Sequence, residues 1–360
     1  MEVFSCKTKI YSGAGAVQAL ENLHGKRLFL VTDPFFMENG TAKQVAQAAK
    51  AEYVEYFSDV QPDPTVALAA EGTAKLKAFS PDLIVALGGG SAMDCAKAMA
   101  YFAKLNCPLV AIPTTSGSGS EVTDFAILTH EKVKHPLVDP RLRPDVAILD
   151  SNLLQALPKS LIADTGFDVL AHALEAYVAK NAGVISDSFA REAFSAAYAN
   201  LPASYAGRRE VRLKVHLAAT MAGVAFSQAG LGLCHAMAHA LGGVFHVPHG
   251  RLNAILLPAV VSCNAHVAGA KYAQLARLSG LGGSADTIAL RNLKNGLIRL
   301  RRELGLPETL VQAGISPREV WAHTGDIVKA TLADPCCGTN PMVVEDFLVR
   351  RILEEVTGHA

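Results

Sequence analysis

Short apolar runs alternate with helical patterns through the first 150 residues, and this alternation constrains the fold more than any other feature. The runs predict strands at 26–32, 53–57, 82–87, 109–112 and 146–149, with helices at 41–51, 66–79 and 92–104. Strands that alternate with helices at this spacing form βαβ units, and the parallel sheet of such units is buried on both faces. We therefore expect an α/β, Rossmann-like domain with a parallel sheet at the N-terminus.

The pattern changes after residue 150. Helical patterns follow one another at 160–179, 185–200, 211–228, 234–245, 252–265, 285–304 and 344–356, without a convincing period-2 run among them. A chain of 360 residues is also too long for one small core. We predict two domains, an α/β domain at 1–155 and an all-α domain at 156–360, and residues 307–341 show no clear pattern.

Composition excludes several classes of partner. Lys plus Arg (33) balances Asp plus Glu (33), which favours neither nucleic acid nor an anionic membrane surface. The N-terminus lacks the pattern of a signal peptide, and no apolar run reaches the ~18 residues of a membrane span. The seven cysteines contain no C-x-x-C spacing and are typical of reduced thiols. We expect a cytoplasmic protein with no nucleic-acid or membrane partner.

Four of the twelve histidines lie between residues 235 and 249, in a segment that is otherwise apolar and rich in Ala and Gly. His235 and His239 are one helical turn apart and so share a face. His249 stands between Pro248 and Gly250, which predict a break and a turn. Imidazole is the commonest protein ligand for metals, so this segment is a candidate metal-binding segment.

A second segment has the same spacing. Asp168 and His172 lie four residues apart in an apolar helical pattern. One carboxylate and several imidazoles from different helices suit a borderline divalent ion such as Fe²⁺ or Zn²⁺. The alternative is that each histidine is a hydrogen-bonded core residue; two segments with ligand-type residues at i, i+4 spacing favour the metal.

Glycines and hydroxyl side chains follow two of the predicted strands. Residues 88–91 (GGGS) lie at a strand-to-helix junction, where backbone N–H groups and the helix N-terminus can bind a phosphate, although such a run can also be only a tight turn. Residues 113–121 (PTTSGSGSE) follow the next strand, and two such loops are typical of a dinucleotide site. Asp33 follows the first predicted strand, at 26–32. It is either a helix N-cap or a ribose ligand that would favour NAD over NADP.

Long motifs in both halves resemble the iron-containing (group III) alcohol dehydrogenase family over essentially the full chain. They are 88–94 (GGGSAMD), 113–123 (PTTSGSGSEVT), 168–176 (DVLAHALEA), 222–227 (AGVAFS), 234–243 (CHAMAHALGG) and 248–250 (PHG). Residues 4–13 and 225–233 are most similar to the 1-propanol dehydrogenases of propanediol-degrading bacterial microcompartments. The resemblance implies the fold of that family, which dehydroquinate synthase also shares.

The resemblance also implies roles for individual residues. It implies metal ligands at Asp168, His172, His235 and His249, diphosphate-binding residues at Gly88, Gly89, Gly90 and Ser91, and further cofactor contacts at Asp33, Asp94, Thr114, Thr115, Ser118 and Lys134. It implies an active-site histidine that is not a ligand at His239, and substrate-pocket positions at Phe226 and Cys336. Many relatives have a threonine at the position of Ser118, which keeps the hydroxyl.

The function that the resemblance implies is hydride transfer between NAD(H) and a short alcohol or aldehyde, with propanal reduced to 1-propanol. Fe²⁺ is the expected ion, with Zn²⁺ or Mn²⁺ as alternatives, and it would polarise the substrate oxygen. His239 is then either a proton carrier or a hydrogen-bonding neighbour of the ligands. A homodimer is implied, and residence in a microcompartment lumen, with shell or cargo proteins as partners, is an alternative to the open cytoplasm.

Three other functions fit parts of the pattern. A diol dehydrogenase of the lactaldehyde or glycerol type would use the same residues. A dehydroquinate synthase-like lyase would need basic residues around the metal motifs, and no Arg or Lys cluster is present there. A catalytically silent dinucleotide-binding protein would be expected to lack a ligand or a loop glycine, and all of these positions are intact.

Overall fold

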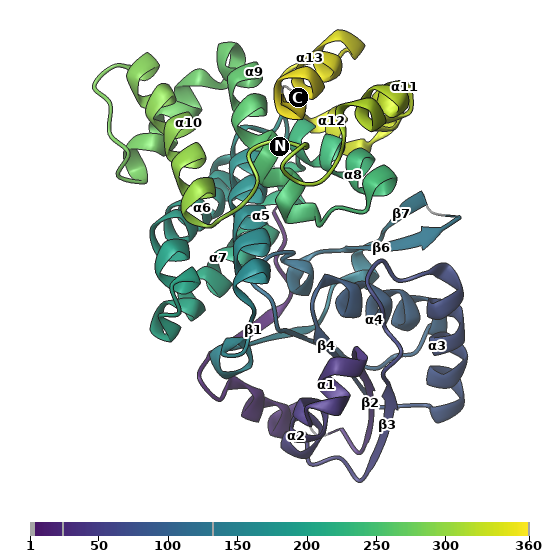
Figure 1. Ribbon diagram of the computed structural model, residues 1–360. Coiled ribbons are helices and arrows are strands. Elements are labelled where there is room, and N and C mark those ends of the chain that lie inside the picture. Colours follow the sequence, from purple (N-terminus) through teal and green to yellow (C-terminus); the bar gives the residue numbers. More distant parts are fainter. Residues whose placement is uncertain (1–3, 24, 132, 359–360) are drawn as a thin grey trace. The chain divides into compact units, whose positions relative to one another are not determined.

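The structure is a computed structural model that describes residues 4–23, 25–131 and 133–358 (Figure 1). The chain divides into two compact units. The α/β unit is Ser5–Leu157, and the helical unit begins at Pro158. Phe4 also belongs to the helical unit, where its ring stacks on that of Phe189 with the centroids 5.8 Å apart.

A six-stranded parallel sheet forms the centre of the α/β unit, which confirms the predicted fold class. Its strands are β1 (Lys9–Gly13), β2 (Arg27–Val31), β3 (Tyr53–Phe57), β4 (Leu83–Gly88), β5 (Leu109–Pro113) and β8 (Val146–Asp150). They lie in the order β1-β8-β5-β4-β2-β3. The edge strand β1 was not predicted, because its sequence KIYSG alternates between exposed and half-buried positions and lacks an apolar run.

Both faces of this sheet are covered. The helical segments of the unit are η1 (Ala16–Leu23), α1 (Pro34–Glu38), α2 (Thr41–Ala48), α3 (Val66–Phe79), α4 (Gly90–Ala103), η2 (Ser120–Val122), η3 (Pro140–Leu142) and η4 (Ser151–Leu154). Successive side chains of a strand point to opposite faces. Leu28 and Leu30 accordingly pack in one core with Val45 of α2, and Phe29 belongs to a second core with Met99 of α4.

An antiparallel hairpin of β6 (Phe125–His130) and β7 (Val133–Val138) lies outside the main sheet and was not predicted. Buried Lys97 of α4 fastens it. The Lys97 ammonium donates to Ser120 Oγ (2.8 Å), Thr123 Oγ1 (3.0 Å) and the carbonyl of Phe125 (3.0 Å). The hairpin and the loop before it are therefore tied to α4 by contacts that no local sequence pattern reveals.

Only helices occur among the described residues from Pro158 onward. They are α5 (Lys159–Val178), α6 (Val184–Tyr205), η5 (Arg209–Val211), α7 (Arg212–Ala229), α8 (Leu233–Phe245), α9 (His249–Leu278), α10 (Asp286–Glu303), α11 (Pro317–Ala333), α12 (Pro335–Thr339) and α13 (Asp346–Thr357). By length and composition α9 could cross a membrane, but 67% of its apolar stretch is buried inside the structure, as in a core helix. Helices α5, α8, α10 and α13 all pack against it.

The structure adds helices in a segment for which nothing was predicted, and one expectation for this unit was wrong. Residues 307–341 contain α11, whose start carries a signal that the pattern analysis missed: Ser316 and Glu319 form a capping box around Pro317. Gly250 is not a turn residue but lies in the first turn of α9. A Cβ at Gly250 would be only 1.9 Å from the carbonyl oxygen of Asp164, so glycine is required for the close approach of α9 to α5.

Candidate metal centre and dinucleotide loops

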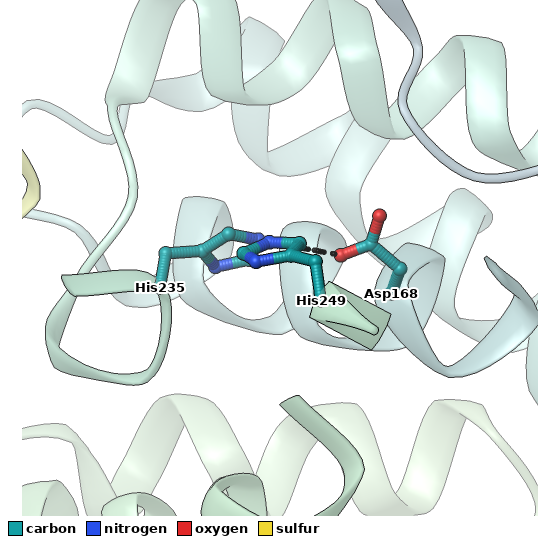
Figure 2. A group of neighbouring side chains, drawn as sticks. All are labelled: Asp168, His235 and His249. Atoms are coloured by element: carbon teal, nitrogen blue, oxygen red, sulfur yellow. Dashed lines mark ion pairs between the residues drawn. The ribbon is translucent and has the colours of Figure 1, made fainter. Parts of the chain in front are cut away.

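Three helices of the helical unit bring the predicted metal ligands together. Asp168 and His172 lie on α5, His235 on α8, and His249 is the first residue of α9. Figure 2 shows the imidazoles of His235 and His249 converging on the Asp168 carboxylate. The ligand atoms of these three residues lie within 4.8 Å of one another. His172 is outside that group of three but adjoins it, because its ring stacks on that of His235 with the centroids 4.5 Å apart.

The spacing of these atoms fits ligands that share one ion. Asp168 Oδ1 lies 3.6 Å from His235 Nε2, 3.6 Å from His249 Nε2 and 3.9 Å from His172 Nε2. These distances are too long for hydrogen bonds. Two atoms that each lie about 2.1 Å from a tetrahedral ion are about 3.4 Å apart. Three imidazoles and one carboxylate without a thiolate are also a donor set that Fe²⁺, Zn²⁺ or Mn²⁺ accepts.

Two fully buried polar residues hold this cluster in place. Glu175 on α5 contacts His235 Nδ1 through Oε2 (2.6 Å) and accepts the backbone N–H of Cys234 through Oε1 (2.6 Å). The carboxylate therefore leaves Nε2 of His235 for an ion. Asn253 on α9 donates to Asp168 Oδ1 (2.8 Å), and its amide nitrogen lies 3.2 Å from His249 Nε2. Both residues orient the predicted ligands and are not themselves predicted to bind the ion.

An ion pair sets the register of the two helices that carry Asp168 and His249. Arg251 of α9 donates through Nε and Nη2 to the two carboxylate oxygens of Asp164 on α5, at 3.1 Å and 3.0 Å. Asp164 stands one helical turn before Asp168, and Arg251 two residues after His249. A bidentate Arg–carboxylate pair has a defined geometry, so it positions one ligand relative to the other.

Electrostatics prepare the cluster for a cation. Burial raises the pKa of the Asp168 carboxyl, but the surrounding imidazoles outweigh burial and hold that pKa well below its ordinary value. Burial lowers the pKa of His249 well below its ordinary value, which keeps the ring neutral. Burial also acts to lower the pKa of His235, but the carboxylates of Asp168 and Glu175 raise it to about 9. An ion that binds His235 would therefore release a proton.

His239 belongs to a second group of side chains beside the first. Its Nδ1 lies 2.8 Å from Asp334 Oδ2, and its ring stacks on that of His249 with the centroids 5.0 Å apart. Cys336 adjoins this pair, since His239, Asp334 and Cys336 have potential ligand atoms within 4.8 Å of one another. His239 thus neighbours the predicted ligands but directs Nδ1 to a different carboxylate.

The predicted substrate-pocket residues both lie at the edge of these groups. Phe226 of α7 is buried and stacks on the His172 ring with the centroids 4.5 Å apart. Cys336 lies in the first turn of α12, where burial raises the pKa of its thiol far above the ordinary value. Their part in binding a substrate stays a prediction.

In the α/β unit, the two predicted loops follow neighbouring strands. Gly88 ends β4 and pairs with Pro113, which ends β5. Gly89 and Gly90 begin α4, and a Cβ at either would lie 3.4 Å from Thr115 Oγ1 or from Ser118 Oγ, respectively. The hydroxyls of the second loop therefore adjoin the glycines of the first, as a phosphate-binding site requires.

Of the other predicted cofactor residues, Thr114, Asp94 and Lys134 form hydrogen bonds or ion pairs within the α/β unit. The backbone N–H of Thr114 donates to Gly88 O (2.9 Å), and Ser91 lies in the first turn of α4. Asp94 is half-buried and accepts from Ser120 Oγ (2.8 Å) and the Ile127 N–H (3.1 Å), so it links α4 to the second loop and to β6. Lys134 on β7 forms an ion pair with Asp63 (2.6 Å). Direct contacts of Asp94 and Lys134 with a cofactor stay predictions.

Asp33 has the position of a helix N-cap. Its Oδ1 accepts the N–H of Phe36 (3.2 Å) at the start of α1, directly after β2. Its other oxygen would lie 3.6 Å from a Cβ at Gly88. The N-cap interpretation of Asp33 is therefore confirmed, and its contact with a cofactor ribose stays a prediction.

Three residues with evident roles in the helical unit were not predicted. Glu175 and Asn253 share helical faces with predicted ligands, seven residues after Asp168 and four after His249, so extending the i, i+4 argument would have found them. Asp334 has only the Asp-Pro signal of a helix start, in the segment that showed no clear pattern.

Comparisons with known proteins agree with both units. Residues 7–151 match the family model described as iron-containing alcohol dehydrogenase, and residues 162–357 match that of the C-terminal part of the Fe-containing alcohol dehydrogenase family. The chain is 38% identical to 1-propanol dehydrogenase PduQ of Citrobacter freundii, over 99% of this chain and 100% of that protein. It is 36% identical to the NADPH-dependent butanol dehydrogenase of Clostridium saccharobutylicum, over 98% and 97%. A solved structure of a 1,3-propanediol oxidoreductase is 30% identical and superposes with a TM-score of 0.92, covering 99% of this chain and 100% of that one.

A parallel sheet with adjoining glycine and hydroxyl loops, together with a buried Asp–His cluster among helices, defines an oxidoreductase of the alcohol dehydrogenase class. The family models and the full-length relatives narrow this class further. The chain belongs to the iron-containing alcohol dehydrogenase family.

Proposed function

We propose that this enzyme interconverts propanal and 1-propanol with NAD(H), and that Asp168, His172, His235 and His249 hold Fe²⁺. The observation that carries the proposal is the convergence of three imidazole Nε2 atoms on Asp168 Oδ1 at 3.6–3.9 Å. A bound divalent ion supplies Lewis-acid polarisation of the substrate oxygen. Propanal as substrate is supported by the relatives, whose names specify 1-propanol, butanol and 1,3-propanediol.

The chain's own residues orient the reactants and move the proton. Glu175 and Asn253 keep the imidazoles and the Asp168 carboxylate aimed at one point. Residues 88–91 bind the cofactor diphosphate, the hydroxyls of Thr114, Thr115 and Ser118 contact its adenosine and ribose, and NAD(H) itself carries the hydride. His239, which is partly exposed, exchanges the proton of the substrate hydroxyl with solvent.

An apolar pocket suits a short substrate. Phe226 supplies an aromatic wall beside His172, and Arg251, two residues after His249, is paired with the Asp164 carboxylate (3.0 Å). A phosphorylated or strongly anionic substrate would need an unneutralised cation, so the lyase alternative is disfavoured. A short diol or hydroxyaldehyde is the second candidate, supported by the similarity to the 1,3-propanediol oxidoreductase structure. We further propose a cytoplasmic homodimer, with a microcompartment lumen as the alternative location because of the PduQ relative.

The test is metal analysis paired with activity on protein purified without oxygen. The wild-type enzyme should contain about one iron per chain and oxidise NADH with C2 to C4 aldehydes, with the highest kcat/KM for propanal. His235→Ala and His249→Ala should lose both the metal and the activity while the chain still folds. His239→Ala is the matched variant on the same helical face, and it should retain the metal but lose turnover.

Three results would each contradict a part of the proposal. Turnover by His235→Ala without bound metal would exclude the ion from the reaction. Loss of metal in His239→Ala would make His239 a ligand and the set of four wrong. A higher kcat/KM for lactaldehyde or glycerol than for the propanal–1-propanol pair would favour the diol enzyme.

A further inference from the structure

One carboxylate, that of Asp334, connects a helix start to a histidine on another helix. Asp334 stands between α11 and α12, and both helices pack against α8 (Figure 1). Its Oδ1 accepts the backbone N–H of Cys336 (2.8 Å) and so caps α12. Its Oδ2 lies 2.8 Å from His239 Nδ1. The cap fixes the carboxylate, and the fixed carboxylate holds the imidazole.

Helix α8 repeats this arrangement one turn apart. His235 directs Nδ1 to Glu175 (2.6 Å), and His239 directs Nδ1 to Asp334 (2.8 Å). Because an ionised carboxylate only accepts hydrogen bonds, it places the imidazole proton on Nδ1 and the lone pair on Nε2. In both histidines Nε2 is thus the nitrogen with the lone pair. In His235 this nitrogen can bind an ion, and in His239 it can accept a proton.

Asp334 is also an ionised group under ordinary conditions. Burial acts to raise the pKa of its carboxyl, but the His239 imidazole and the Cys336 N–H outweigh burial and hold that pKa at about 2. The His239 side chain is 25% exposed, so water can exchange a proton with it. The pair therefore combines an ionised acceptor at Nδ1 with an imidazole that is partly exposed to solvent.

We propose that Asp334 is a positioning residue for catalysis, which fixes the orientation and tautomer of His239 so that Nε2 can accept the substrate proton. This inference rests on the proposed function of His239. In alcohol oxidation the substrate O–H bond breaks and its proton goes to Nε2, while the C–H hydride with both electrons goes to C4 of NAD⁺. The imidazolium then gives one proton to water, and the products are aldehyde, NADH and H⁺.

Two substitutions separate this role from helix capping. Serine caps a helix about as well as aspartate but is too short to reach His239, so Asp334→Ser keeps the cap and removes the partner of Nδ1. Asparagine also caps, but its single oxygen is then occupied and its NH₂ faces His239. Asp334→Asn therefore makes Nδ1 an acceptor and places the proton on Nε2.

The measurement is kcat for 1-propanol oxidation by iron-loaded enzyme, with metal content and circular dichroism as controls. Both variants should retain wild-type metal content and helicity, and kcat should fall about tenfold to a hundredfold. The asparagine variant should be at least as slow as the serine variant, because its Nε2 carries a proton. KM for 1-propanol should change much less than kcat.

A double-mutant cycle distinguishes a role through His239 from a merely structural role, because only the former makes the effects of the two substitutions on kcat non-additive. If Asp334 acts through His239, then adding Asp334→Asn to His239→Ala should change kcat by less than about twofold. Independent, multiplicative effects would overturn the inference. So would wild-type kcat in both Asp334 variants when His239→Ala is slow, and the proposed function would stand. Wild-type kcat in His239→Ala would instead refute the proton role of His239 itself, and the Asp334 inference with it.

Discussion

Asp33 both caps a helix and places a charge beside the glycine loop, so a substitution that removes its side chain changes both properties at once. As an N-cap it accepts from the Phe36 N–H, and as a neighbour of the glycine loop it brings negative charge to the end of β4. Burial raises the pKa of this carboxyl, and the hydrogen bonds from α1 oppose that rise. A carboxylate here would repel the 2′-phosphate of NADP. An NADPH-dependent butanol dehydrogenase is 36% identical to this chain over 98% of it, so membership of the family does not by itself decide between NAD and NADP.

We predict that Asp33→Ser shifts preference toward NADPH, because serine keeps the cap and removes the charge. The ratio of kcat/KM for NADPH to that for NADH should rise about fivefold to thirtyfold, corresponding to about 1–2 kcal/mol of relieved repulsion. Steady-state kinetics with both cofactors measure this ratio. Asp33→Gly should show the same shift but lose a few tenths of a kcal/mol more stability, because glycine is a weaker cap. An unchanged ratio in both variants would remove Asp33 from the cofactor site.

Residue types and spacing indicated two candidate metal-binding segments, because the i, i+4 relation is a property of one helix, whereas the set of four predicted ligands came from the family resemblance. The spacing could not show how these helices meet. Asn253 contacts Asp168 across 85 positions of sequence, and Asp334 contacts His239 across 95. Such partners depend on tertiary packing, so the sequence pattern favoured a metal cluster but could not identify the residues that hold its ligands in place.

At the scale of elements, the contact between α5 and α9 is what brings a ligand from each helix together. Gly250 allows the backbones to touch, and the Arg251–Asp164 pair sets their register. His249 precedes Gly250 directly, so a change in helix spacing would move the imidazole. The same helix contains Gly269, where a Cβ would meet nothing within 4 Å.

We predict opposite effects for alanine at these two glycines. Gly250→Ala should destabilise the chain by about 3 kcal/mol or more, because the clash is with backbone that no side-chain rotation relieves. It should also lower iron content. Gly269→Ala should stabilise by about 0.5–1 kcal/mol, because alanine loses less conformational entropy in a helix. Denaturant unfolding and metal analysis measure both. Normal iron content and stability in Gly250→Ala would mean that the close approach of α5 and α9 is not needed.

The sequence predicted best the strands that are buried on both faces, because such strands are continuous apolar runs. Strands β4 and β5 are buried along their whole length and are accordingly apolar throughout, and β8 is apolar up to its last residue, the buried Asp150. The edge strand β1 and the hairpin of β6 and β7 have mixed burial, since each is covered on part of its surface only. For these elements the pairing partners, rather than their own sequence, decide the structure.

At the scale of the whole molecule, the predicted metal ligands and the predicted cofactor-binding residues belong to different units. All four predicted metal ligands and His239 come from the helical unit, and all of the predicted cofactor residues come from the α/β unit. Each unit also contains many buried hydrophobic side chains of its own. Each ligand should therefore stabilise mainly the unit that binds it, since binding to the folded state shifts local opening equilibria.

We predict that hydrogen exchange will separate the two binding events. Fe²⁺ added without oxygen to chelator-treated protein should slow amide exchange in α5, α8 and the first turns of α9. NAD⁺ alone should slow exchange in residues 88–94 and 113–120. His249→Ala is the matched control: it should abolish the protection by Fe²⁺ and retain the protection by NAD⁺. Protection of α5 and α8 by Fe²⁺ in His249→Ala would place the ion elsewhere. Protection by NAD⁺ that leaves residues 88–94 unaffected would show that the glycine loop is only a tight turn.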